Sequence, residues 1–129
     1  MIVVDASAIL EILLNTRVAT RVADRLFAAG ETLHAPHVLD LEVAQVLRRY
    51  AAAGALTERR GHEALADFAD LPLDRYAHHL FLDRIWELRH NLTAYDAAYV
   101  ALAEALAAPL VTRDATLARA GHRARVEVL

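Results

Sequence analysis

Short apolar runs alternate with longer amphipathic segments along the 129-residue chain. Runs such as residues 2–4 and 109–112 are short and mostly apolar, which is typical of buried strands. Between such runs, apolar residues recur three and four positions apart, most clearly over residues 38–53, as in a helix packed by one face. Strands separated by helices cannot pair as tight hairpins, so the pattern predicts a parallel sheet.

Glycine, proline and threonine mark the expected ends of these elements, with Thr57 and Thr93 as helix N-caps. Strands are predicted over residues 2–4, 32–36, 73–77 (a strand or a turn), 109–112 and 126–129. Helices are predicted over residues 7–14, 18–29, 38–53, 57–70, 78–90, 93–107 and 114–121. The sequence therefore predicts one α/β domain over residues 1–129, with a central parallel β-sheet of four to five short strands flanked by helices on both faces.

The amino-acid composition excludes several kinds of catalytic and metal-binding site. Cysteine is absent, which excludes disulfides and thiolate metal sites. All basic residues are arginine, so lysine-dependent phosphate or Schiff-base chemistry is excluded, and a GC-rich bacterial genome is indicated. A net charge of −3 argues against bulk electrostatic binding of nucleic acid. We find no signal peptide and no apolar run long enough for a membrane span, and therefore expect a cytoplasmic protein.

Two acids follow predicted strands. The first strand runs directly into Asp5 in MIVVDASAIL, and Asp114 comes shortly after PLVT. Both have an ordinary explanation, because aspartate often caps the helix that follows. Ser7 can also cap the first helix, which would leave Asp5 free. Since functional groups in parallel α/β folds gather beyond the carboxyl ends of the strands, both acids are also candidates for a site.

Glu42 lies on the apolar side of its helix, three residues after Leu39 and four before Val46. A carboxylate facing inward is costly unless it is paired or bound to metal. The plainer alternative is a salt bridge to Arg48 or Arg49. Asp40, two residues earlier, points about 200° around the helix and is not assigned to a site.

Asp96 stands three residues after Thr93, close to a capping box, and a capping role is one explanation for it. Asp96 also aligns with Tyr99 on a face that must pack inward. Four carboxylates converging on one sheet edge would need a compensating charge. With lysine and cysteine absent, Mg²⁺ or Mn²⁺ is the natural partner, and such a cluster suits phosphodiester hydrolysis.

Four stretches together resemble the PIN domain, and more closely the VapC-type ribonuclease toxins of bacterial toxin–antitoxin pairs. These stretches are VVDASAIL, APHVLDLEVAQVLRR, LTAYDAAYVALAEAL and LVTRDATLARA, in the family's order and over nearly the whole chain. The acidic quartet of the family falls on Asp5, Glu42, Asp96 and Asp114. The small hydroxyl residue that follows the first acid in the family falls on Ser7, and the serine or threonine that precedes the last acid falls on Thr112.

The resemblance implies an endoribonuclease that prefers single-stranded RNA and uses Mg²⁺ or Mn²⁺. It also implies a VapB-like antitoxin whose tail reaches the acidic site, and we expect a homodimer that joins the antitoxin in a larger complex. Arg48 and Arg49 are candidates for contact with RNA or antitoxin. Arg17 and Arg21 are further candidates, although such a row is more simply a solvated surface.

Two other functions compete with this hypothesis. The first is a phosphoaspartate enzyme, because such enzymes also have an aspartate after the first strand. Haloacid-dehalogenase-like phosphatases, however, need a second aspartate where this chain has Ser7. Both these phosphatases and receiver domains use a lysine, which this chain lacks. The second alternative is a non-catalytic PIN-like module that binds RNA or protein. An incomplete acidic set would signal such a module, whereas all four acids are present.

Overall fold

A computed structural model describes residues 1–119 and 121–129 of the chain and contains a five-stranded parallel sheet in the order β3-β2-β1-β4-β5. Every predicted strand is present, including residues 73–77, for which the sequence allows a strand or a turn. The strands are β1 (Ile2–Val4), β2 (Leu33–Pro36), β3 (Leu73–Tyr76), β4 (Leu110–Thr112) and β5 (Val126–Val128).

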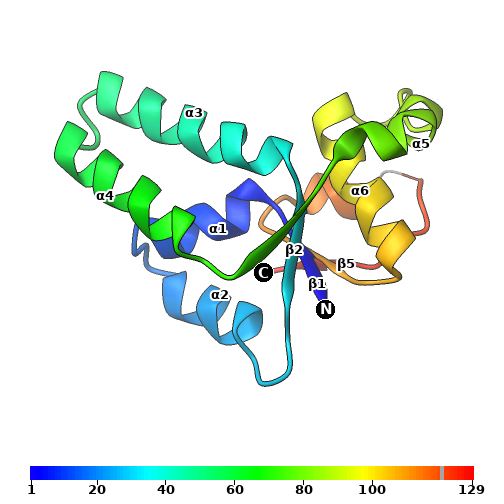
Figure 1. Ribbon diagram of the computed structural model, residues 1–129, viewed down its shortest axis with the longest axis horizontal. Helices are drawn as coiled ribbons and strands as arrows, with labels where there is room; N and C mark the ends of the chain where they lie inside the picture. The colour runs from blue at the N-terminus through cyan, green and yellow to red at the C-terminus, as the bar shows by residue number, and fades with distance from the viewer. Residues whose placement is uncertain (120) are drawn as a thin grey trace.

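Helices cover both faces of the sheet, as predicted. In Figure 1, α1 to α4 lie on one side of β1 and β2, and α5 and α6 lie on the other. The helices are α1 (Ala6–Leu13), α2 (Ala19–Leu26), α3 (Val38–Ala52), α4 (Glu58–Ala69), α5 (Leu82–Glu87) and α6 (Ala94–Leu106), with 3₁₀ turns η1 (His78–Phe81) and η2 (Ala115–Arg119). None of the helices in these described ranges is both long and apolar enough to cross a membrane.

Strand β1 lies at the centre of the sheet, and its three residues are fully buried. Val3 pairs with His34 on one side and with Leu110 on the other. A strand enclosed on both edges and both faces has to be apolar throughout, which explains its unbroken run of Ile and Val. The chain leaves β1 directly at Asp5, so that residue is held at the middle of the carboxyl edge.

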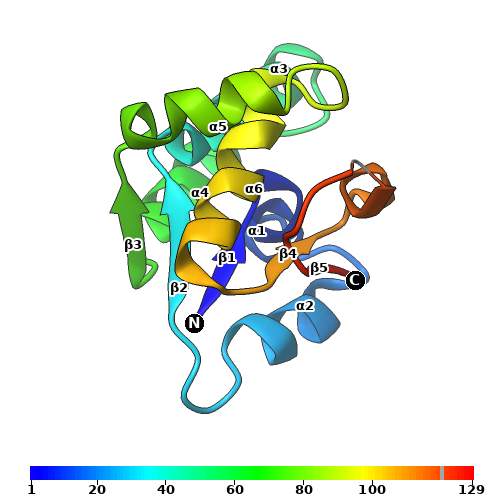
Figure 2. The same cartoon turned by 90° about the vertical axis from the view of Figure 1, so that its right-hand side faces the viewer.

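Helix α6 packs closely against the sheet because of its small side chains. Every residue from Ala97 to Ala103 is buried, and four of these seven are alanine. Helix α6 contacts β1, β2 and β4. Its N-terminal turn therefore lies near the carboxyl ends of these strands, as Figure 2 shows from a second direction.

The structure differs from the predicted elements in three places. The helix expected over 78–90 is the turn η1 followed by the short α5, and neither has a buried residue to stabilise a longer helix. Helix α2 ends at Leu26 rather than at residue 29, and Gly30, with φ of +82°, lies in the loop to β2. The segment expected as a helix over 114–121 forms η2, and its residue Ala120 lies outside the described part of the chain.

His34 is a buried titratable group remote from the acids, and we expect it to make stability fall in acid. Its ring contacts the hydroxyls of Thr32 and Tyr76, both at 2.8 Å, and it is only 3% exposed. Burial lowers the pKa of His34, while nearby Asp74 partly opposes that shift. A lowered folded-state pKa gives stability that is present above the unfolded value of 6.5 and is lost as pH falls through the folded value.

The titration of one group can change the free energy of unfolding by at most about 1.4 kcal/mol per pH unit. We therefore expect the difference in unfolding free energy between the wild type and His34→Gln to shrink as pH falls from 7 to 5. Urea unfolding at several pH values measures this difference. A difference that does not change with pH would show that His34 does not titrate differently on folding.

Candidate active site

Asp5 is both a helix cap and the centre of a hydrogen-bond network at the carboxyl edge of the sheet. Its Oδ1 accepts from the backbone N–H of Ala8 at 3.2 Å and from Ser7 Oγ at 2.7 Å. Its Oδ2 accepts from Thr112 Oγ1 at 2.5 Å. The capping explanation for Asp5 is thus confirmed, whereas the idea that Ser7 replaces it as the cap is wrong. Ser7 instead donates to Asp5 and accepts from the N–H of Arg113.

Thr112 links the two acids that follow strands. It is fully buried, and its Oγ1 accepts from the N–H of Asp114 at 2.9 Å while donating to Asp5. Asp114 Oδ1 in turn accepts from the backbone N–H and the hydroxyl of Thr116 at the start of η2. Neighbouring strands β1 and β4 bring these residues together, because Asp5 N–H donates to the carbonyl of Val111.

Glu42 points inward from α3, as its place on the apolar face predicts. Its Oε1 accepts a hydrogen bond of 2.8 Å from the hydroxyl of Tyr99 on α6. No ion pair reaches Glu42 among residues 1–119 and 121–129, so the predicted alternative of a bridge to Arg48 or Arg49 is not observed there. Asp40 turns away and pairs with Arg75 of β3 at 2.8 Å.

Asp96 occupies the first turn of α6, where Thr93 is the N-cap. The Thr93 hydroxyl accepts from the backbone N–H of Asp96 at 3.2 Å, as predicted. Asp96 is half-buried, and it precedes the fully buried stretch of α6 that packs on the sheet. Capping by Thr93 is complete without the carboxylate of Asp96, which is thus available for other interactions.

The four acids influence one another electrostatically. Burial raises the pKa of Asp5, and the Asp96 carboxylate raises it further against the lowering effect of three hydrogen bonds. Burial also raises the pKa of Glu42, with further increases from Asp96 and Asp5. For Asp96, burial and the charge of Asp114 both raise the pKa. Hydrogen bonds through Thr112 link Asp5 to Asp114, and the bond from Tyr99 links Glu42 to the helix that carries Asp96, so the four acids lie around one edge of the sheet.

Positive charge does not balance this region. Among the described residues, no arginine or histidine forms an ion pair with any of the four acids. In the same part of the chain, no three acid or histidine side chains are close enough together to hold an ion by themselves. The arrangement is therefore a loose cluster of oxygen donors with excess negative charge.

Two grooves border the cluster on α3. A groove of about 610 Å³ is lined by Glu42, Gln45, Arg48, Arg49 and Tyr95 together with apolar side chains. A second, of about 460 Å³, is lined by Ser7, Glu11, Arg49, Tyr50 and Arg113 among others. Both candidate arginines of α3 are exposed and line these grooves.

The other two candidate arginines lie on the α2 side of the molecule. Arg17 precedes α2 rather than lying within it, so the predicted row along one helix face begins only at Arg21. Both side chains are exposed. Helix α2 lies beside the end of the sheet where the strands begin, away from the acids (Figure 2).

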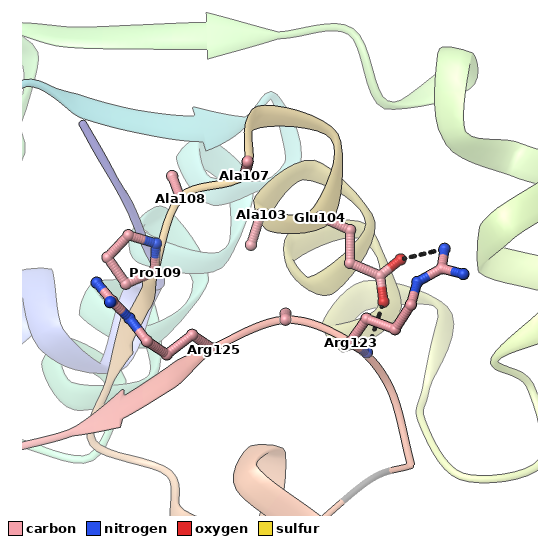
Figure 3. A pocket seen from close by; sticks show the side chains of 8 residues that line it. Ala103, Glu104, Ala107, Ala108, Pro109, Arg123 and Arg125 are labelled. Carbon is pink, nitrogen blue, oxygen red and sulfur yellow. Dashed lines mark hydrogen bonds and ion pairs between the residues drawn. The ribbon is translucent and has the colours of Figure 1, made fainter.

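A further hollow, drawn in Figure 3, lies at the C-terminal end of α6 and does not involve the acids. Glu104 points into it and accepts hydrogen bonds from Arg84 and from the backbone of Arg123. Because arginine already neutralises this carboxylate, the hollow lacks the unbalanced charge of the acid cluster.

Two residues take part in the site without being predicted to do so. For Tyr99 the sequence indicates only that it aligns with Asp96, and its aromatic side chain at an inward position of α6 is the available signal. Arg113 joins the site through its backbone N–H to Ser7 and its guanidinium to Glu11. Such contacts between distant segments leave no mark in a single sequence.

Comparison with known proteins gives a consistent assignment. The PIN domain family model matches residues 2–123. Ribonuclease VapC9 of Mycobacterium tuberculosis is 49% identical over 122 residues, covering 95% of this chain and 92% of that protein. Ribonuclease VapC12 of the same species is 41% identical over 130 residues, covering 100% and 99%.

Solved structures agree on the fold. VapBC2 from Rickettsia felis, bound to a DNA fragment from their promoter, has a TM-score of 0.74 at 15% identity and covers 98% of each chain. VapC20 of Mycobacterium tuberculosis, a sarcin-ricin loop cleaving toxin, has a TM-score of 0.67 at 16% identity, covering 95% of this chain and 97% of that one. Because the family model matches residues 2–123 and the two sequence relatives align along almost the whole chain, this protein belongs to the PIN domain family and, within it, to the VapC ribonucleases.

Proposed function

We propose that this protein is the endoribonuclease toxin of a toxin–antitoxin pair and that it hydrolyses RNA phosphodiester bonds with the help of Mg²⁺ or Mn²⁺. The observation that carries the proposal is the cluster of Asp5, Glu42, Asp96 and Asp114, which share one region without a cationic partner among the described residues. Its sequence relatives of 41% and 49% identity are named ribonucleases.

The donor set fits such an ion. Mg²⁺ usually keeps several waters and takes one or two carboxylates from the protein, so a compact cage of three acids is not required. Asp5, Asp96 and Asp114 are the proposed ligands, one or two of them in direct contact with the ion and the rest through its bound waters. Glu42 is proposed to bind a second ion or to orient the attacking water. A bound divalent ion lowers the pKa of water and stabilises charge on the scissile phosphate.

The protein's own groups prepare the site. Ser7 and Thr112 hold both oxygens of Asp5 in place, and Thr116 holds one oxygen of Asp114. The exposed Arg48 and Arg49 are proposed to contact the phosphates of RNA or an acidic segment of the antitoxin. The negative charge of the four acids repels the phosphates of RNA. In this proposal the bound ion and the two arginines offset that repulsion.

We also propose a homodimer that joins a VapB-like antitoxin. Large apolar side chains are exposed on η1, on α5 and at the starts of α3 and α6, namely Leu41, Leu80, Leu82, Trp86 and Tyr95. Tyr95 lines one groove with Leu41 and another with Leu82, and exposed apolar surface of this kind often marks a protein interface. Sedimentation equilibrium at micromolar concentration tests the dimer, and a monomer would contradict it.

The proposed function predicts that purified protein cuts single-stranded RNA when Mn²⁺ or Mg²⁺ is supplied and that excess EDTA removes this activity. The measurement is gel analysis of a labelled RNA, with Ca²⁺ as a control ion of the same charge. RNA that is bound but never cut, with or without the ion, would favour the non-catalytic module instead.

A further inference from the structure

Tyr99 combines full burial with a polar contact at the acid cluster. It is 1% exposed and is among the largest fully buried side chains of the described residues. A phenol hydroxyl in such a position needs an acceptor. The fold provides Glu42 Oε1, which accepts from the hydroxyl at 2.8 Å.

The hydrogen bond fixes Glu42 relative to Asp96. Tyr99 lies three residues after Asp96 on α6, whereas Glu42 comes from α3. A glutamate side chain has several rotatable bonds, and Glu42 has no ion pair among the described residues to restrict it. The Tyr99 hydroxyl therefore sets where this carboxylate lies with respect to the acid on the neighbouring helix.

Tyr99 can act only as a donor in this contact. Its hydroxyl hydrogen points to the Glu42 carboxylate, which offers oxygen acceptors to it. The donated hydrogen bond occupies Oε1 of Glu42. The second carboxylate oxygen, Oε2, is then the one left to contact an ion or a water in the groove that Glu42 lines.

We propose that Tyr99 is a positioning residue of the site, which acts through Glu42 by holding its carboxylate beside Asp96 and presenting Oε2 to the ion or the attacking water. The inference rests on the proposed function and adds to it a residue outside the acidic quartet. A side chain that only fills the core between α3 and α6 would need no hydroxyl, and phenylalanine would serve equally well.

Tyr99→Phe tests the proposal, because it removes the hydroxyl and keeps the packing volume. We expect Mn²⁺ binding to RNA-free protein to weaken about 10- to 100-fold, the usual effect of losing a group that orients a metal ligand. Electron paramagnetic resonance of free Mn²⁺ measures this binding without any activity assay. In RNA cleavage, kcat at saturating Mn²⁺ should fall while KM for RNA is unchanged, since Tyr99 is buried.

Tyr76→Phe is the matched control, because it also removes a phenol hydroxyl from a hydrogen bond, in this case with His34. Mn²⁺ binding by this variant should equal that of the wild type. Thermal unfolding of both variants checks that they are folded.

A double-mutant cycle separates positioning from packing. If Tyr99 acts through Glu42, the Tyr99→Phe change should alter Mn²⁺ binding less than about twofold in a Glu42→Ala background. Glu42→Gln provides a second background that retains the side-chain volume. An equal loss in the wild-type and Glu42-substituted backgrounds would overturn the proposal in favour of a packing role.

The outcomes also separate this inference from the function on which it rests. Wild-type protein that cuts RNA, together with a Tyr99→Phe variant of unchanged Mn²⁺ binding and kcat, overturns the role of Tyr99 alone. Wild-type protein that neither binds Mn²⁺ nor cuts RNA overturns the proposed function, and the positioning role with it.

Discussion

Asp5→Asn should lower kcat/KM for RNA cleavage by at least about 1000-fold, equivalent to about 4 kcal/mol of transition-state stabilisation. The reason is the loss of a charged oxygen donor at the centre of the acid cluster. Asparagine is nearly isosteric and is an equally good helix N-cap, so α1 should keep its first turn. In the wild type the Thr112 hydroxyl donates to Oδ2 of Asp5, and in the variant it can rotate to accept from the amide N–H of asparagine.

Loss of folding will not explain this loss of activity. Burial raises the pKa of Asp5, so its charge is unfavourable in the folded state at neutral pH. Removing that charge should leave the melting temperature unchanged or raise it. Asp40→Asn is the matched control, because Asp40 lies on α3 near Glu42 but pairs with Arg75 outside the cluster. It should retain wild-type activity, and near-normal cleavage by Asp5→Asn would contradict the metal-nuclease proposal.

Mn²⁺ at 100 times its dissociation constant should stabilise the protein by about 2.7 kcal/mol, which corresponds to roughly 10 °C in melting temperature. The proposed metal site is assembled only in the folded protein, where a bound ion would offset the repulsion between the carboxylates, whereas the unfolded chain offers no such site. Asp96→Asn should largely abolish this shift. Thermal unfolding with and without Mn²⁺, with EDTA-treated protein as the reference, gives the measurement.

The same cluster sets a pH dependence for the metal-free protein. The pKa values of Asp5, Glu42 and Asp96 are all raised on folding, so stability from these groups is present below their unfolded values of 3.8 to 4.5 and is lost as pH rises through the folded values. The metal-free Asp96→Asn variant should therefore gain stability over the wild type as pH rises. The difference in unfolding free energy between the two proteins is the quantity to measure, because the titration of all other groups cancels in it. A difference that shrinks toward neutral pH would contradict this account.

Much of the fold could be predicted because its signals are local. The apolar run of β1, the cap at Thr93 and the inward position of Glu42 depend on residues within one or two turns of each other. Helix α5 departs from prediction for the opposite reason. It lacks buried residues, so its extent depends on the surrounding packing rather than on its own pattern.

The sequence by itself predicted which residues form the proposed acidic site, with Asp5 and Asp114 after strands, Asp96 in the first turn of a helix and Glu42 on the apolar face of another helix. Only the tertiary structure decided that β1 lies between β2 and β4, so that Asp5 and Thr112 share a hydrogen bond across 107 positions in the chain. It also decided that Tyr99 of α6 reaches Glu42 of α3. Strand order and helix packing arise from contacts between distant segments, and the period of a single segment does not encode its partner. The strand that opens the chain places Asp5 at the middle of the sheet edge only because the rest of the fold encloses it.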